Sequence, residues 1–104
     1  MSQILFVLRI IAKKTLRDFW EIHKDVEESL KSWYNEFEKS KFENFNQLKS
    51  EYPSASILQD NRVVFNIKGN HYRLIVKINF DFQLCWIRFI GTHAQYDKIN
   101  ANII

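Results

Sequence analysis

The sequence predicts an α+β (α/β) fold. We expect an N-terminal strand, two to three helices packed on one face of a small antiparallel sheet, and a short C-terminal helix. Three apolar runs separated by turn residues occupy positions 62–90, as expected for consecutive strands. Apolar residues recur at helical spacing over positions 16–37. The chain has 104 residues, of which 46% are hydrophobic, and we expect one domain over residues 1–104 with a single modest core.

The first two runs predict a β-hairpin. Residues 62–68 alternate between the two faces of a strand, and Gly69 with Asn70 then offers a two-residue turn, because glycine accepts a positive φ without steric cost. This turn sets two cross-strand pairs, Phe65 with Leu74 and Asn66 with Arg73.

The third run follows a turn within residues 79–82. The predicted register places three pairs on the core face: Val76 with Cys85, Leu74 with Ile87 and Tyr72 with Phe89. On the other face it sets Arg73 directly across from Arg88. Opposed like charges destabilise a sheet, whereas a phosphate between two guanidiniums removes the repulsion and accepts forked hydrogen bonds. The alternative is that both guanidiniums turn into water while their stems cover Trp86.

The rest of the chain supplies helices and one more strand. Residues 4–11 are almost continuously apolar, which is typical of a strand covered on both faces and added to the same sheet. Capping signals at Thr15 and Asp25 predict two helices with a break near His23, and residues 45–52 predict a third helix that ends before Pro53. Residues 100–104 are expected to be loosely held unless a partner covers them.

The exit from the third strand predicts the short C-terminal helix. Thr92 and Gln95 form a capping-box pattern, which would start a helical turn at His93. Spacing of four residues then puts His93 and Asp97 on one face of that turn.

Charge and cysteine content narrow the class of protein. Residues 1–60 carry nine Lys and Arg against ten Asp and Glu, whereas residues 61–104 carry six against two. The basic part thus coincides with the predicted sheet, as a nucleic-acid-binding surface would, although ordinary fluctuation gives the same pattern. Cys85 is the single cysteine, so no internal disulfide can form, and it fits a reducing cytosol.

Several kinds of site and segment are not expected. No glycine-rich phosphate loop and no His/Cys cluster with zinc spacing occur, so we expect no metal and no cofactor. The apolar run at residues 4–12 is too short to span a membrane and lacks a preceding basic region, so neither a signal peptide nor a membrane contact is expected.

Two stretches carry a family pattern: residues 65–76, FNIKGNHYRLIV, and residues 88–97, RFIGTHAQYD. Together with the helix bearing Leu30 and Trp33-Tyr34 and the turn at residues 52–55, they make the chain resemble the HigB family within the RelE-like toxins of bacterial toxin–antitoxin modules. The resemblance covers about residues 9–99. Residues 1–7 precede the usual start of the family, so we expect either an extension of the first strand or a start codon assigned too far upstream.

The resemblance implies an mRNA interferase, a cytoplasmic toxin that cleaves messenger RNA at the ribosome without a metal. It implies as partner a HigA-type antitoxin with a helix-turn-helix domain, through which alone the toxin would meet operator DNA. Such cleavage needs a base for the 2′-hydroxyl, positive charge at the phosphate and an acid for the 5′-oxygen. We assign the phosphate to Arg73 and Arg88, and proton transfer to His93, because histidine exchanges protons near neutral pH.

The remaining expected site residues support these three. Asp97 would orient His93, and Tyr96 would stack on a base or donate a proton. Further RNA contacts are expected from Lys68, Arg62, Asn70, His71, Asn66 and Trp86. A purely structural role for His93 at the helix end is the alternative. Two other functions stay open: a binding module that holds RNA or blocks the ribosome without cleaving, and a structural subunit whose basic face is covered by an acidic partner.

Overall fold

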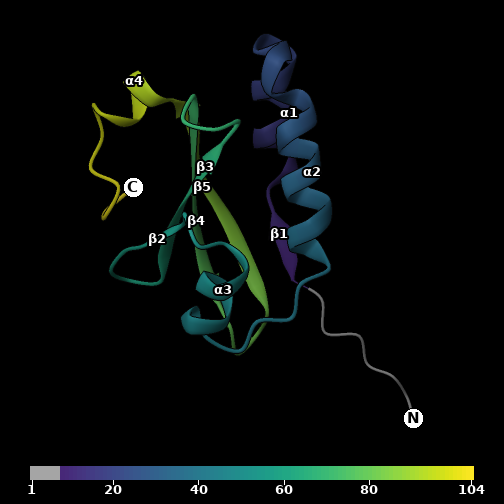
Figure 1. The fold of residues 1–104 in the computed structure, drawn as a ribbon, viewed down its shortest axis with the longest axis vertical. Helices are drawn as coiled ribbons and strands as arrows, with labels where there is room; N and C mark the ends of the chain where they lie inside the picture. Colours follow the sequence, from purple (N-terminus) through teal and green to yellow (C-terminus); the bar gives the residue numbers. More distant parts are fainter. Residues whose placement is uncertain (1–7) are drawn as a thin grey trace.

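The computed structural model describes residues 8–104, which form five strands, four α-helices and one 3-10 turn. In chain order these are β1 (Arg9–Ile11), α1 (Lys13–Ile22), η1 (Lys24–Val26), α2 (Glu27–Glu38), α3 (Phe45–Glu51), β2 (Ser56–Ile57), β3 (Arg62–Ile67), β4 (Tyr72–Asn79), β5 (Leu84–Thr92) and α4 (His93–Tyr96). The predicted α+β class is confirmed (Figure 1).

The strands form one sheet in the order β1-β5-β4-β3-β2. The pairs β2–β3, β3–β4 and β4–β5 are antiparallel, but β1 runs parallel to β5, so the sheet is mixed rather than purely antiparallel. β1 is a short edge strand with Arg9 exposed and Ile11 40% exposed, so the expectation of a strand covered on both faces was wrong. Residues 4–7 of that predicted strand lie outside the described residues.

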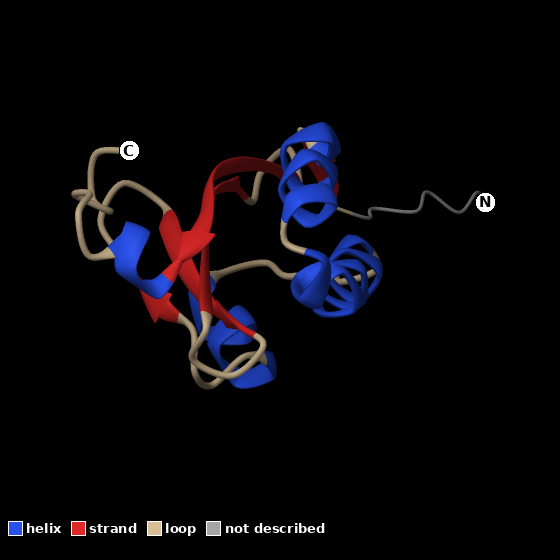
Figure 2. Cartoon of the chain, turned by 90° about the horizontal axis from the view of Figure 1, so that it is seen from above, coloured by secondary structure: helices blue, strands red, loops and turns tan. Residues whose placement is uncertain are grey.

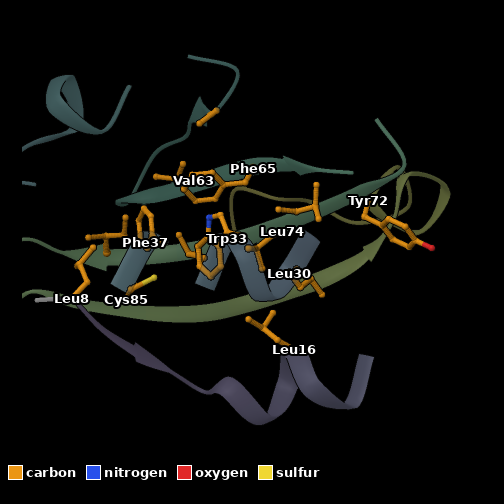
Figure 3. Packing of buried hydrophobic residues seen from close by; sticks show 14 of the residues in the cluster. Leu8, Leu16, Leu30, Trp33, Phe37, Val63, Phe65, Tyr72, Leu74 and Cys85 are labelled. Carbon is orange, nitrogen blue, oxygen red and sulfur yellow. The ribbon is translucent and has the colours of Figure 1, made fainter. Parts of the chain in front are cut away.

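The main hydrophobic core lies between the helices and one face of the sheet (Figure 3). Helices α1 and α2 lie on that side, whereas α4 lies across the sheet from them (Figures 1 and 2). Helices α1, α2 and α3 bring fully or nearly fully buried side chains: Leu16 and Trp20 from α1, Leu30, Trp33 and Phe37 from α2, and Leu48 from α3. They meet the strand residues Val63, Phe65, Ile67, Tyr72, Leu74, Val76, Ile78 and Cys85.

The predicted helices are present, with differences at their starts. The break between α1 and α2 lies at His23 as expected, and α3 ends before Pro53. However, α1 starts at Lys13 rather than at Thr15, and Asp25 makes no cap to α2. The Asp25 carboxylate instead accepts hydrogen bonds from the Tyr72 hydroxyl at 2.7 Å and from Lys68 Nζ at 3.2 Å. It therefore ties the α1–α2 junction to the start of β4.

The β3–β4 hairpin has the predicted pairs, Phe65 with Leu74 and Asn66 with Arg73. Its turn comprises four residues, 68–71, rather than two, and both Lys68 and Gly69 adopt positive φ. β2 was missed, because its two residues lie in a stretch expected to be a loop.

The predicted β4–β5 register was wrong. Asn79 pairs with Leu84 across a four-residue loop ending at Gln83, which has a φ of 52°, so Ile78 rather than Val76 lies opposite Cys85. A bulge at Arg88 then adds one more residue to β5. Beyond the bulge, Ile90 takes the core-facing place that the sequence assigned to Phe89, and Phe89 pairs with Ile75 on the other face.

The end of the chain returns to the sheet instead of lying loose. The backbone oxygen of Ile104 accepts a hydrogen bond from Arg62 Nε at 2.9 Å, and Arg88 Nε lies 3.4 Å from the same oxygen. The segment after α4 passes on the same side of the sheet as that helix (Figure 1).

Candidate RNA-cleavage site

The face of the sheet opposite α1 and α2 carries most of the predicted site residues, in two groups. The first group, called the α4 cluster below, joins the β3–β4 turn to α4 and comprises Asn70, His71, Arg73, His93, Tyr96 and Asp97. The second, called the β4–β5 groove, is lined by Asn61, Lys77, Ile78, Asn79, Trp86 and Arg88 and has a volume of about 380 Å³.

Arg73 is held in one orientation at the centre of the α4 cluster. Its Nη1 donates to the backbone oxygens of Asn70 (3.1 Å) and Tyr72 (3.2 Å), and its Nη2 donates to Asn70 Oδ1 (3.0 Å). The guanidinium carbon lies 5.8 Å from the ring centre of Tyr96. A guanidinium has five N–H groups, so within the described part of the chain two remain to bind an anion in a forked geometry.

The approach of Arg73 to α4 depends on Gly91. These two residues are directly paired across β4 and β5, and Gly91 has no side chain to separate Arg73 from the helix. A Cβ at Gly91 would lie 2.5 Å from Phe89 Cζ and 2.8 Å from Gln95 Oε1. Glycine is therefore required here by close approach, since both side chains already fill the space.

α4 is fixed at its start by the predicted capping box. Thr92 Oγ1 accepts from the backbone N–H of Gln95 at 3.1 Å, and Gln95 Oε1 accepts from the backbone N–H of Thr92 at 2.8 Å. The backbone N–H of His93 donates to the carbonyl of His71 at 3.0 Å, which joins α4 to the β3–β4 turn. As predicted, His93 and Asp97 share one face, with 3.4 Å between Nδ1 and Oδ1.

Arg88 is not part of the α4 cluster. The bulge leaves it without a directly paired residue on β4, and Arg73 lies opposite Gly91. The predicted pairing of Arg73 with Arg88 was therefore wrong, because the β4–β5 loop comprises residues 80–83 and the bulge adds one further residue to β5. Arg88 is exposed and lies in the β4–β5 groove, where Lys77 and Trp86 are directly paired.

Comparison with protein families matches residues 26–99 to HigB_toxin, described as the RelE-like toxic component of a toxin-antitoxin system. The chain belongs to the HigB toxin family. The mRNA interferase toxin HigB of Escherichia coli K12 is 31% identical over 96 residues, which cover 90% of this chain and 92% of that protein. Proteins named mRNA interferase HigB from Escherichia coli O157:H7 and Shigella flexneri match with the same identity and coverage.

The match to the HigB family includes both groups of residues on this face. Every member of the α4 cluster lies within residues 26–99, as do Trp86 and Arg88.

Among residues 8–104, no three His, Cys, Asp or Glu side chains gather closely enough to hold a metal ion. None of the helices formed by these residues has the length and apolar character needed to cross a membrane.

Two residues expected to bind RNA have other contacts in this HigB-family chain. Arg62 is only 6% exposed, and besides Ile104 it binds Asp60 Oδ2 through Nη1 at 2.9 Å, which is the first cause of the lowered pKa of Asp60. Lys68 pairs with Asp25, on the side of the sheet that bears the helices. Asn66 is exposed and is paired with Arg73, so it does lie beside the α4 cluster.

Lys77 is a further candidate residue and was not among the site residues predicted from the sequence. It shares the face of Arg73, because the two are four positions apart on β4, a distance of roughly 13 Å along a strand. Its Nζ lies 3.2 Å from Asp60 Oδ2, and Lys77 lines the β4–β5 groove together with Trp86, the residue with which it is paired. The signal that would have identified it is a second cation on β4 four residues after Arg73, which puts both side chains on one face of the strand.

Proposed function

We propose that this chain is an mRNA interferase: the toxin of a toxin–antitoxin pair, which acts as an endoribonuclease on messenger RNA and so inhibits translation. The observation that carries the proposal is that the guanidinium of Arg73 is held beside Tyr96. Tyr96 belongs to α4, which also presents His93 and, at its C-cap, Asp97. Membership of the HigB family and the names of the similar proteins support it.

The chemistry follows from what each side chain can do. The two free N–H groups of Arg73 would bind the non-bridging oxygens of the scissile phosphate and stabilise the charge that develops there. His93 would move the proton in the attack by the 2′-hydroxyl or in the departure of the 5′-oxygen, a contribution of about 10²–10⁴-fold. Asp97 lies within reach of His93 Nδ1 and would orient the ring. Tyr96 would stack on a base or donate a proton.

The β4–β5 groove would extend the RNA path along the same face. Trp86 offers an aromatic surface for a base, while Arg88 and Lys77 offer positive charge for the backbone, the usual combination for single-stranded RNA. In this proposal the toxin acts in the cytoplasm on ribosome-associated mRNA. A HigA-type helix-turn-helix antitoxin neutralises it, and operator DNA is bound only through that antitoxin.

A non-catalytic inhibitor is the second candidate function. Within the described residues, no contact joins the side chains of Arg73 and His93, whereas Arg73 is strongly oriented by Asn70. An inhibitor that only binds RNA or the ribosome would need Arg73 and could dispense with His93.

The test compares Arg73→Ala, His93→Ala and Arg17→Ala in a cleavage assay with RNA and in primer extension on cellular mRNA after induction. Arg17 is an exposed cation on α1, so its replacement controls for loss of one positive charge. We expect a loss of at least 10²-fold for the first two variants and no change for the third. Full activity of both Arg73→Ala and His93→Ala would reject the assigned chemistry, and growth arrest without new mRNA ends would favour the non-catalytic inhibitor.

A further inference from the structure

A groove of about 380 Å³ lies between α2 and the end of β3. Its helix wall includes Glu28, Ser32 and Glu36, and its strand wall is formed by residues 65–68. We call it the α2–β3 groove. The RNA-cleavage chemistry assigned above makes no use of this surface.

The strand wall of the groove is an open sheet edge. β2 pairs only with Val63 and Val64, and the backbone N–H of Leu58 donates to the carbonyl of Arg62 at 2.8 Å. The backbone groups of Arg62 therefore face the β2 side, and because these groups alternate along a strand, those of Asn66 face the same side. Within residues 8–104, no strand pairs with Asn66 there. Such an edge is a template for another chain.

Trp33 gives a second, independent indication of a missing partner. Its side chain is 95% buried at the wall of the groove, and its indole N–H has no hydrogen-bond partner among the described residues. Figure 3 shows the indole nitrogen on the side of the ring that faces β3. A buried donor without an acceptor is unfavourable, and because the nitrogen has almost no exposed surface, a small opening of the groove would let a carbonyl oxygen beside β3 accept from it.

We propose that the α2–β3 groove binds an extended segment of the antitoxin, which pairs with Asn66 as an added strand and places a basic side chain between Glu28 and Glu36. The backbone of a peptide supplies both the donor and the acceptor that the open edge needs. Neither carboxylate takes part in a salt bridge within the described part of the chain. The inference rests on the antitoxin partner that defines the family, and it does not depend on RNA cleavage.

A second copy of the toxin fits the same groove less well. In a symmetric dimer the same surface meets itself, so the Glu28 and Glu36 carboxylates of both copies would be brought together. Repulsion between four carboxylates opposes that pairing, whereas a Lys or Arg of another protein is attracted by them.

Binding in this groove would also reach the RNA site. The strand wall leads into the turn of residues 68–71, whose Asn70 orients Arg73 and whose His71 holds α4. A segment paired with Asn66 thus lies beside the α4 cluster, where it can neutralise the toxin.

The edge contact is tested by comparing Asn66→Pro with Asn66→Ala. Both remove the side chain, but only proline removes the backbone N–H, and in the free toxin that N–H faces the open edge and not β4. We expect the antitoxin, titrated into each purified toxin by calorimetry, to bind Asn66→Pro at least tenfold more weakly than Asn66→Ala. Near-UV circular dichroism verifies that both variants are folded.

The charge contact is tested with the double variant Glu28→Lys/Glu36→Lys, and Glu21→Lys on α1 controls for a charge reversal outside the groove. The double variant should lose at least tenfold in antitoxin affinity at low salt, with a smaller loss at high salt, and Glu21→Lys should bind as the parent does. Equal affinity of all three proteins would contradict the proposed basic side chain.

Amide hydrogen exchange on the unmodified toxin decides the question even if Asn66→Pro does not fold. The proposal expects the amide of Asn66 to be protected at least tenfold in the complex. It is overturned if exchange at Asn66 is unchanged by the antitoxin, or if the free toxin is a dimer that Asn66→Pro dissociates, because the groove would then belong to a second copy.

Discussion

Replacing Gly91 by alanine should destabilise the attachment of α4 to the sheet, because the added methyl group has no room. The new methyl carbon would lie 2.5 Å from Phe89 Cζ and 2.8 Å from Gln95 Oε1, whereas carbon atoms in contact prefer about 3.5–4.0 Å. Phe89 is half-buried, so its ring can turn at the low end of the overpacking cost of about 1–3 kcal/mol. Gln95 can move only by releasing Thr92, which costs about 0.5–2 kcal/mol for a cap. Together these two costs give an expected loss of about 1.5–3 kcal/mol.

The assay is urea unfolding followed by tryptophan fluorescence, with Gly69→Ala as the contrasting variant. Gly69 has a φ of 64° and no atom within 4 Å of an added Cβ, so alanine there is strained only by its backbone, by about 1–2 kcal/mol. Gln95→Ala should therefore reduce the cost of Gly91→Ala, because it empties one side of the contact, and leave the cost of Gly69→Ala unchanged. The reasoning is refuted if Gly91→Ala is as stable as the parent, or if Gln95→Ala does not alter its cost.

Two further predictions concern stability against acid and thiol reactivity. The pKa of Asp25 is lowered first by the hydrogen bond from Tyr72 and next by the hydrogen bond from Lys68. The stability that this carboxylate contributes is therefore present above about pH 4, and it is lost as the pH falls through the lowered pKa of the folded state. Tyr72→Phe should raise the pKa of Asp25 toward 3.8, measured by NMR titration, and should reduce the difference between urea midpoints at pH 7 and pH 3. An unaltered titration of Asp25 would contradict this. Burial raises the pKa of the Cys85 thiol, so a thiol reagent should modify the native protein only as fast as the core around Cys85 unfolds. Fast modification in the absence of urea would show that the core is accessible.

Local sequence signals predicted the parts of the site that depend on neighbours in the chain. Thr92 and Gln95 are three residues apart and form the expected cap, and Gly69 supplies a positive φ in the expected hairpin. Because the cap and the hairpin are both local, the sequence located Arg73 and His93 on the correct elements. The pairing of Asn66 with Arg73 followed from the same hairpin.

The remaining contacts depend on features that alternation does not encode. Residues 87–90 read Ile-Arg-Phe-Ile, so either Phe89 or Ile90 could face the core. The alternation therefore gives no sign of the bulge between them and the start of β5. The positive φ of Gln83, which is not a glycine, gave no turn signal for the loop length. The bond between Arg62 and Ile104 joins residues 42 positions apart, and no local rule predicts it.

The bulge at Arg88 determines on which face of the sheet the His93 imidazole and the Tyr96 phenol lie. On β5, odd-numbered residues such as Cys85 face the helices before the bulge, and even-numbered residues such as Ile90 do so after it. Gly91 consequently shares a face with Arg73, and the chain leaves β5 as α4 on that face. An uninterrupted strand would turn Gly91 toward the helices instead. One inserted backbone residue, and no side chain, thus selects the side of the sheet on which His93 and Tyr96 lie near the guanidinium of Arg73.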